Sequence, residues 1–178
     1  MKQLLVFALS LFLIQGTFAQ KINTKDSKVE FEVSNMGKMV QGTVLNVKGT
    51  VNFDENNLAK STFEATADPK TINTQSKGRD KHLQKDDFFG TATFPEIKMV
   101  SKSIKKTENG YEATATLTIR DVEMEVVVPF TVTKKGNQQV LEGNFSVTRK
   151  TFKLGEKMEE GSIGLEVAVK IMAVVDVE

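Results

Sequence analysis

The chain has 178 residues, with 24 Lys or Arg against 23 Asp or Glu and no cysteine. Its net charge of +1 argues against a nucleic-acid partner, because such binding needs a basic surface that displaces counterions from phosphates. The lack of cysteine excludes disulfides, thiolate metal ligands and a cysteine nucleophile, and the length is sufficient for one domain with a substantial core.

Residues 1–19 have the pattern of a secretory signal peptide rather than of a retained amphipathic anchor. Lys2 precedes an apolar run over residues 4–14, and a small residue stands at the expected cleavage site. The apolar run is too short for a transmembrane helix, and no later run reaches about twenty apolar residues. We therefore predict cleavage after Ala19, a periplasmic or secreted domain over residues 20–178, and no integral membrane segment.

The first half of the mature chain contains short segments in which apolar and polar side chains alternate. Residues 29–33, 47–53 and 63–67 follow this period of two, with Phe31 and Phe63 in the apolar phase. A turn-forming cluster, Asp-Glu-Asn-Asn, separates the second segment from the third. We interpret all three segments as strands, each with one face toward the core.

Residues 78–89 interrupt the alternation with a charged segment that holds the only histidine of the chain and ends in two phenylalanines. We interpret residues 76–85 as a short helix and the aromatic pair as a hydrophobic plug that closes one end of a barrel. Arg79 and Asp80 then form a polar rim, tied to each other or to the backbone. Arg79 is the expected partner of a phosphate or carbonyl group at the mouth.

His82 is the residue of this segment that is suited to acid–base chemistry. It lies two positions from Asp80, so the two side chains point in different directions on a helix or a strand. One histidine without cysteines is a poor ligand set for a transition metal, and Asp86 and Asp87 lack the spacing of a calcium loop. We therefore predict no catalytic residue, no metal site and no cofactor, with Asp86 and Asp87 as capping or solvent-facing residues.

A change of phase marks a hairpin in the second half of the chain. Apolar residues occupy odd positions up to Ile119 and even positions from Val122. A two-residue turn at Arg120 and Asp121 keeps both apolar sets on one face, so we predict that Ile119 pairs with Val122. Asp121 is acceptable in this turn because Asp tolerates a left-handed backbone better than most residues.

Strand patterns also follow Pro95, cover residues 141–147 and are clearest over residues 163–177, where every odd position is apolar. The chain therefore predicts an all-β fold of about eight antiparallel strands, without a long helix, that closes into a barrel. An eight-stranded barrel is filled by side chains or holds one small ligand. Small residues in the apolar phase either let strands pack closely or leave an apolar channel; they are Gly49, Ala65, Ala67, Ala113, Ala115 and Gly143.

Three groups of residues resemble the central motif of the YceI-like family, which reads R-D-x-H-L, then D-F-F, then an aromatic residue before proline. These groups are residues 79–83, 87–89 and 94–95. The resemblance covers nearly the whole mature chain. Further matches lie at residues 27–31, residues 117–119, Arg149 and Phe152.

The resemblance implies an eight-stranded, lipocalin-like antiparallel β-barrel with a short helical lid, which binds a polyisoprenoid or another long-chain lipid in an elongated apolar cavity. It implies an exported carrier or storage protein without catalysis, and it leaves the formation of a homodimer open. We expect the ligand to be contacted, in the cavity and at its mouth, by Phe31, Phe63, Arg79, Asp80, His82, Leu83, Phe88, Phe89, Leu117, Ile119 and Phe145.

The chain departs from the family pattern at three places. Residues 35–37, Asn-Met-Gly, stand where the family often has a histidine, which puts a contact to the ligand head group there in doubt. Asp121 stands at a hairpin position that is usually glycine, and Gly90 replaces a common acidic residue. We expect the last two changes to be tolerated as turn variation.

Two alternative functions stay open at this point. A small outer-membrane β-barrel needs aromatic belts at both interfaces, which are hard to build with one tyrosine and no tryptophan. An enzyme that modifies a lipid or a quinone would use His82. Solubility without detergent tests the first alternative, and loss of turnover in His82→Ala with lipid binding retained tests the second.

Overall fold

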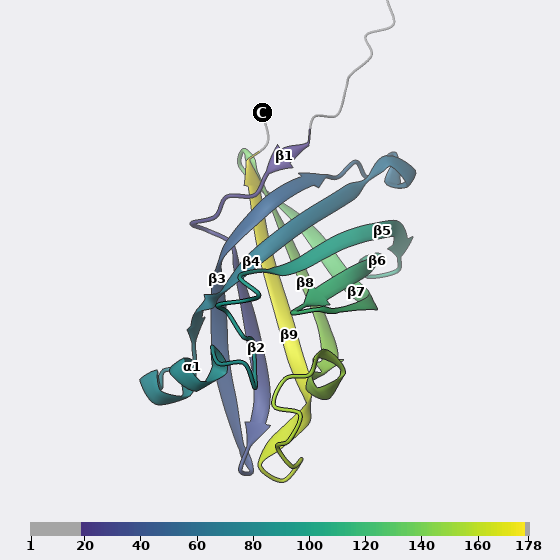
Figure 1. Ribbon diagram of the computed structural model, residues 1–178. Helices are drawn as coiled ribbons and strands as arrows, with labels where there is room; N and C mark the ends of the chain where they lie inside the picture. The colour runs from purple at the N-terminus through teal and green to yellow at the C-terminus, as the bar shows by residue number, and fades with distance from the viewer. Residues whose placement is uncertain (1–18, 177–178) are drawn as a thin grey trace, which may run out of the picture.

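Nine antiparallel strands form one sheet in the computed structural model, which describes residues 19–176 (Figure 1). Strands β2 to β9 close into a ring of eight because β3 pairs with β4 as well as with β2, and the short β1 pairs with the end of β3. The predicted all-β barrel is confirmed, whereas the predicted signal peptide lies almost wholly outside the described residues. The elements are β1 (Gln20–Lys21), β2 (Lys28–Asn35), β3 (Lys38–Asn52), the 3-10 helix η1 (Leu58–Lys60), β4 (Thr62–Asn73), α1 (Lys77–Leu83), β5 (Ile97–Thr107), β6 (Gly110–Ile119), β7 (Val122–Lys135), β8 (Gln138–Thr148), the 3-10 helix η2 (Arg149–Phe152) and β9 (Ile163–Asp176).

The alternation of apolar side chains decides which face of each strand points into the barrel. In β6 the odd positions from Ala113 to Ile119 are buried, and the threonines between them are partly exposed on the outer face. Strand β9 pairs with β2 on one side and with β8 on the other over most of its length. The alternation in the sequence therefore corresponds to side chains that point alternately into the barrel and out of it.

The β6–β7 hairpin has the predicted register, because Ile119 pairs with Val122 across the turn. The left-handed residue of this turn is Arg120, with a φ of 58°, and not Asp121 as predicted. Asp121 instead accepts a hydrogen bond from the Lys153 side chain at 2.7 Å. This contact, together with one to a backbone amide, lowers the pKa of the Asp121 carboxyl group.

Strand β3 is longer than the alternation predicted, since it begins at Lys38 rather than near Val47. Its pairing with β4 shifts between Leu45 and Lys48, at a bulge where Asn46 has a φ of 56°. A bulge breaks the period of two, so the sequence pattern fades where this strand bends. Beyond the bulge, a Cβ atom at Gly49 would lie 2.0 Å from the carbonyl oxygen of Glu64, so glycine lets β4 approach closely.

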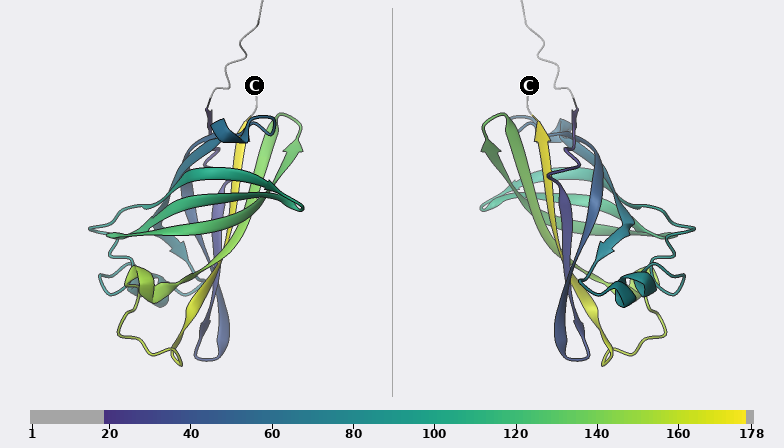
Figure 2. Two further views of the ribbon diagram at one scale, coloured as in Figure 1. Left: turned by 90° about the vertical axis from the view of Figure 1, so that its right-hand side faces the viewer. Right: turned by 90° about the vertical axis from the view of Figure 1, so that its left-hand side faces the viewer.

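Two pairs of neighbouring strands separate before their ends. Strands β4 and β5 are paired only over four positions, from Glu64 to Ala67 of β4. Strands β7 and β8 are paired from Phe130 of β7 onward, and Pro129 has no N–H to continue that ladder. Helix α1 and the chain after it cover the first separation, and η2 contacts β7, β8 and β9 at the second (Figure 2). Helix α1 is shorter at both ends than the predicted helix over residues 76–85.

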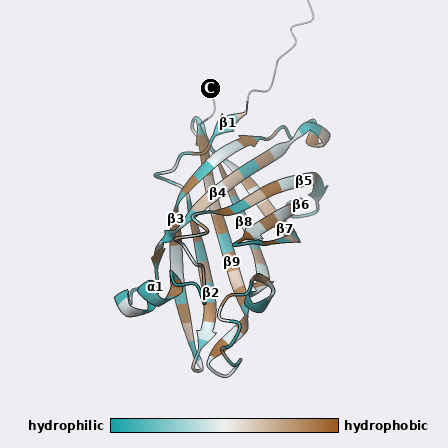
Figure 3. Cartoon of the chain, viewed as in Figure 1, coloured by the Kyte–Doolittle hydropathy of each residue, from teal (hydrophilic) through white to brown (hydrophobic). Residues whose placement is uncertain are grey.

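Hydrophilic and hydrophobic residues are mixed along the strands (Figure 3), and charged residues lie on the outer face of the barrel. Ion pairs link strands on this face, with nitrogen–oxygen distances between 2.6 and 3.3 Å; two of them join neighbouring strands and one joins β5 to β7 across β6. Among the described residues, no helix has the length and hydropathy needed to cross a membrane. The ion pairs on the outer face are Lys98–Glu64, Lys102–Glu125 and Lys170–Glu142.

Candidate ligand cavity

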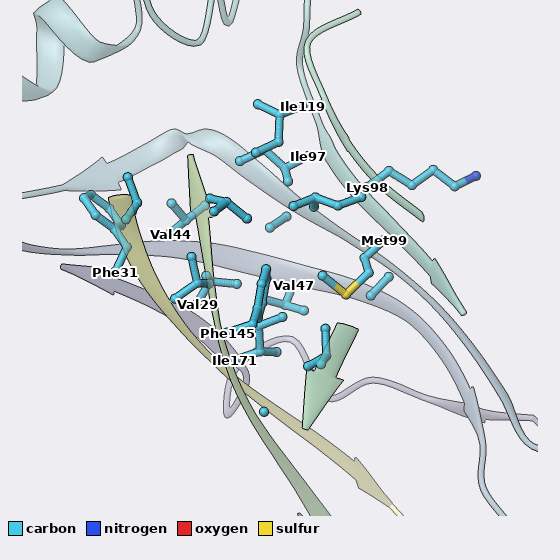
Figure 4. A pocket seen from close by; sticks show the side chains of 18 of the residues that line it. Val29, Phe31, Val44, Val47, Ile97, Lys98, Met99, Ile119, Phe145 and Ile171 are labelled. Carbon is cyan, nitrogen blue, oxygen red and sulfur yellow. The ribbon is translucent and has the colours of Figure 1, made fainter. Parts of the chain in front are cut away.

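The interior of the barrel holds an apolar cavity of about 230 Å³. Side chains from all eight strands of the ring line it, together with residues of the two covering segments. Figure 4 shows side chains of several strands around this space, among them Phe31 of β2, Val44 of β3, Met99 of β5 and Ile171 of β9. The wall is almost entirely carbon, so the cavity is suited to an apolar molecule.

Many of the side chains that face this cavity keep accessible surface inside the barrel. Val29, Phe31 and Val33 of β2 line the cavity, and each is only partly buried. The same holds for Val167 and Val169 of β9. Covering apolar surface is favourable by about 25 cal/mol for each Å², so these residues offer a driving force for a ligand that fills the space.

The small residues in the apolar phase divide between the two roles predicted for them. Ala65, Ala67 and Ala113 line the cavity, and their small size leaves room for a ligand. Gly143 also lines it, but a Cβ atom there would lie 2.9 Å from a Val128 methyl group, so this glycine lets Val128 pack closely. Gly49 and Ala115 are not among the lining residues, and Gly49 serves the close approach of β3 and β4. Both interpretations therefore hold, each for different residues.

Polar residues are rare in the cavity wall, where the described lining contains Thr66, Lys98 and Arg149. Lys98 contributes its alkyl chain, and its amine points away from the space (Figure 4). That amine lies 2.6 Å from a carboxylate oxygen of Glu64, and this hydrogen bond raises the pKa of Lys98. The lysine is therefore a charged group of the outer face and not a ligand contact.

Eight of the eleven predicted ligand-contact residues line the cavity, and three do not. The three are Arg79, Asp80 and His82, all on α1. The eight that line it come from the four strands β2, β4, β6 and β8, from the end of α1 and from the turn after it. These eight residues are Phe31, Phe63, Leu83, Phe88, Phe89, Leu117, Ile119 and Phe145.

Arg79 and Asp80 both form hydrogen bonds with Thr74. The Asp80 carboxylate accepts hydrogen bonds from the Thr74 amide at 2.8 Å and from its hydroxyl at 2.6 Å. Arg79 donates from Nε to the Thr74 hydroxyl at 2.7 Å and from Nη2 to the Thr74 carbonyl at 2.8 Å. These contacts fix α1 to the end of β4, with Thr74 as the joint between them. The prediction that the pair is tied to the backbone is confirmed by the contacts to the Thr74 amide and carbonyl, and its contact with a ligand stays a prediction.

His82 pairs with Asp87 and not with Asp80. Its Nε2 lies 2.8 Å from an Asp87 carboxylate oxygen, and its ring packs edge-on against Phe88 with the centroids 5.0 Å apart. The backbone carbonyl of Asp87 also accepts a hydrogen bond from the Gly155 amide at 2.7 Å. The histidine therefore supports the turn that places Phe88 in the cavity wall.

The described residues contain no group of three or more His, Cys, Asp or Glu side chains that could hold a metal ion.

Arg149, which was matched to the family pattern but not predicted as a site residue, organises the segment between β8 and β9. Its side chain is 2% exposed, and its five N–H groups donate to five backbone carbonyls at 2.6 to 3.0 Å. Burial lowers the pKa of the guanidinium group, and the Glu160 carboxylate opposes this effect. The five accepting carbonyls belong to Leu154, Gly155, Met158, Ile163 and Gly164.

Thr74→Val is expected to lower the free energy of unfolding by about 2 kcal/mol, because it keeps the shape of a buried residue and removes the hydroxyl that Arg79 and Asp80 share. Urea denaturation followed by circular dichroism measures this loss. Thr62→Val is the control, since Thr62 is an exposed threonine at the start of β4, whereas Thr74 directly follows that strand. Equal stability of the two variants would contradict the role of Thr74 as the joint.

Comparison with known proteins places the chain in a family. The sequence pattern of the YceI-like domain matches residues 20–175. Protein YceI of Escherichia coli is 33% identical over 101 residues, a match that covers 56% of this chain and 53% of that protein. The match to this relative therefore spans about half of its length.

Two solved structures share the fold. BcnA of Burkholderia cenocepacia superposes with a TM-score of 0.80 at 26% identity, over 86% of this chain and 98% of that one. A polyisoprenoid binding domain from Saccharophagus degradans, implicated in plant cell wall breakdown, superposes with a TM-score of 0.72. It is 14% identical and covers 90% of this chain and 99% of that one, so this likeness shows the fold alone.

Proposed function

We propose, from the premise that this chain belongs to the YceI-like domain family, that it binds a long-chain isoprenoid or a related lipid inside the barrel and carries or stores it without catalysis. The single observation that supports this most is the apolar cavity whose inward side chains keep accessible surface. The polyisoprenoid binding domain of Saccharophagus degradans has the same fold. A ligand of that class is therefore a natural candidate here.

The apolar chain of the ligand supplies the binding energy in this proposal. Each methylene group that leaves water contributes about 0.8 kcal/mol, and ordering a flexible chain offsets part of the gain. Charged partners for a head group are scarce inside, because the Lys98 amine points outward and the donors of Arg149 are all used by carbonyls. Affinity should therefore follow the length and shape of the chain more than the identity of its head group.

The alternatives find less support in the geometry. A barrel embedded in lipid would have to bury cross-strand ion pairs such as Lys102–Glu125, and a charge on the lipid face costs about 2 to 4 kcal/mol at the midplane. An enzyme that uses His82 would need it near the substrate, but His82 does not line the cavity. We propose that the predicted signal peptide sends the carrier to the periplasm or beyond.

Mature protein is expected to bind geranylgeraniol with a dissociation constant in the micromolar range or below, about −8 kcal/mol. Native mass spectrometry before and after organic extraction measures both this complex and any lipid that co-purifies. Geranic acid and geraniol serve as short-chain controls, and both should bind much more weakly because they cover less of the cavity wall. A protein that purifies without lipid and also fails to bind geranylgeraniol would sink the proposal.

A further inference from the structure

The two covering segments form one structural unit at the end of the barrel where the strands separate. We define the lid as residues 84–96, which follow α1, together with residues 149–162, which include η2. The Gly155 amide donates to the Asp87 carbonyl at 2.7 Å, so the backbones of the two segments are directly joined. Both lie at the end of the barrel opposite β1 (Figures 1 and 2).

The lid forms part of the cavity wall. Phe88 and Phe89 of the first segment line the cavity, and so does Leu154 of the second. Phe88 and Leu154 pack in one apolar cluster with Phe152, which is 1% exposed, and with residues of β5, β6 and β7. Displacing the lid would therefore open the cavity at the two places where the strand ladders end.

A polar clasp at the β6–β7 turn holds the lid to the barrel. Arg120 donates from Nη1 to the carbonyl of Phe88 at 2.9 Å and to the carbonyl of Lys153 at 3.0 Å, one in each segment. Its guanidinium also lies over the Phe94 ring, 5.4 Å from the centroid. The ion pair between Lys153 and Asp121, at 2.7 Å, stands beside it. One turn of the barrel thus grips both segments of the lid.

The clasp is less completely satisfied than the contacts of Arg149. The Nε of Arg120 is buried and has no hydrogen-bond partner among residues 19–176. Arg120 also has a φ of 58°, which is uncommon for a residue with a long side chain. The Lys153 and Asp121 side chains are about half exposed, so water competes for their ion pair. The clasp therefore closes the lid with contacts that are readily exchanged for water.

The opposite end of the barrel is packed by aromatic rings. Phe53 meets Tyr111 edge-on with the centroids 4.8 Å apart, and Tyr111 stacks on Phe130 at 5.5 Å. Ile22, just after β1, is buried and forms a bridge with Val175 of β9. Backbone hydrogen bonds also tie this end to the barrel wall, from the Ile22 amide to the Gly49 carbonyl at 3.0 Å and from the Asn23 amide to the Val174 carbonyl at 2.7 Å. Opening it would break contacts to the strands themselves, so the end with the lid is the one suited to open.

We propose that the lid is the portal of the cavity, and that release of Arg120 from the Phe88 and Lys153 carbonyls admits and releases the apolar ligand. The part of this inference that concerns the ligand rests on the proposed function, whereas the opening of the lid can be measured on the protein without a ligand. The lid would then govern the rates of uptake and release, while the cavity wall governs the affinity.

Cross-linking the clasp tests the portal. The chain has no cysteine, so the double variant Asp121→Cys with Lys153→Cys gives one defined pair for a bis-maleimide that contains a reducible disulfide. After loading with all-trans-retinol, a fluorescent isoprenoid alcohol, cross-linked protein is expected to release it about tenfold more slowly in stopped-flow experiments, and reduction should restore the rate. The matched control is Lys102→Cys with Glu125→Cys, a pair joined at 2.8 Å between β5 and β7, away from the lid. Release that is unchanged by the first cross-link, or equally slowed by the second, would overturn the portal.

Arg120→Asn tests the clasp without a ligand. Asparagine tolerates a positive φ but is too short to grip both segments, so amides of residues 84–96 and 149–162 should exchange with deuterium about tenfold faster. Amides of β9 that pair with β2 are the internal control. Unchanged exchange in the lid would overturn the role of Arg120 as a clasp.

The two proposals can fail separately. If wild-type protein does not bind retinol, the proposed function and the portal are both contradicted. Faster exchange in the lid of Arg120→Asn would still show that Arg120 holds the lid closed.

Discussion

Arg149→Met is expected to lower the free energy of unfolding by about 4 kcal/mol. The substitution keeps an unbranched apolar chain but removes five donors at once, and it leaves five carbonyls near the barrel interior without their partner. A buried carbonyl without a partner costs about 1 to 3 kcal/mol, and water reaches some of the five after the segment relaxes. The estimated loss is therefore smaller than the sum over all five.

The stability of Arg149→Met is best measured by urea denaturation at neutral pH, with Lys150→Met as the control. Lys150 is the next residue of η2 and is exposed, so its replacement tests the loss of a charge without the loss of the carbonyl contacts. We expect the control to change stability by less than about 0.5 kcal/mol. If Arg149→Met stayed within 1 kcal/mol of the wild type, the five contacts would be far weaker than their geometry indicates.

The architecture of the barrel was predictable because one physical rule repeats along the chain. Strands with one dry face need a period of two, which β6 shows over residues 113–119 and β9 shows over residues 165–171, before the consecutive buried residues 173–175. The change of phase at Ile119 and Val122 then set the register of a hairpin that the structure confirms. The first part of β3 escaped prediction because a bulge at Asn46 breaks the period.

The hydrogen bonds that hold the lid and α1 in place were not predictable, because the sequence pattern does not show which backbone groups a polar side chain will reach. Arg120 meets Phe88, which lies 32 positions earlier in the chain, and Lys153, which lies 33 positions later. Arg79 looked like a head-group contact because it is charged and stands next to an aromatic plug. Two of its donor atoms, Nε and Nη2, bind Thr74, only five positions away, and nothing in the sequence indicates this structural use of the arginine.

The apolar residues of the cavity were easier to place than its polar ones for the same reason. Phe31, Phe63 and Phe145 follow the inward phase of their strands, and a strand leaves a side chain only two directions. All three line the cavity. A charged side chain at the end of a strand has many more possible partners, because a long polar side chain can reach the backbone groups of several neighbouring residues. Tests of ligand binding should therefore begin with the apolar wall.

Ile171→Trp is expected to weaken the binding of geranylgeraniol about 100-fold, or by about 3 kcal/mol, while the barrel stays folded. Ile171 of β9 faces the cavity between Val29 of β2 and Gly143 of β8 (Figure 4). Because Ile171 lines the cavity, an indole at this position extends into the space that the ligand would occupy. It displaces about four methylene groups of the ligand, at about 0.8 kcal/mol for each.

The matched control for Ile171→Trp is Ala168→Trp, which places the same side chain on the outer face of the same strand, where Ala168 is exposed. The chain contains no tryptophan, so each variant has a single emission band that reports its surroundings, blue-shifted for the first and red-shifted for the second. Isothermal titration calorimetry with geranylgeraniol measures the affinities, and urea denaturation checks that both variants fold. Wild-type affinity in Ile171→Trp, with its indole emission showing an apolar environment, would mean that the ligand binds elsewhere than in this cavity. Equal losses in both variants would point to a general effect on the barrel, because the outward indole takes no space from the ligand.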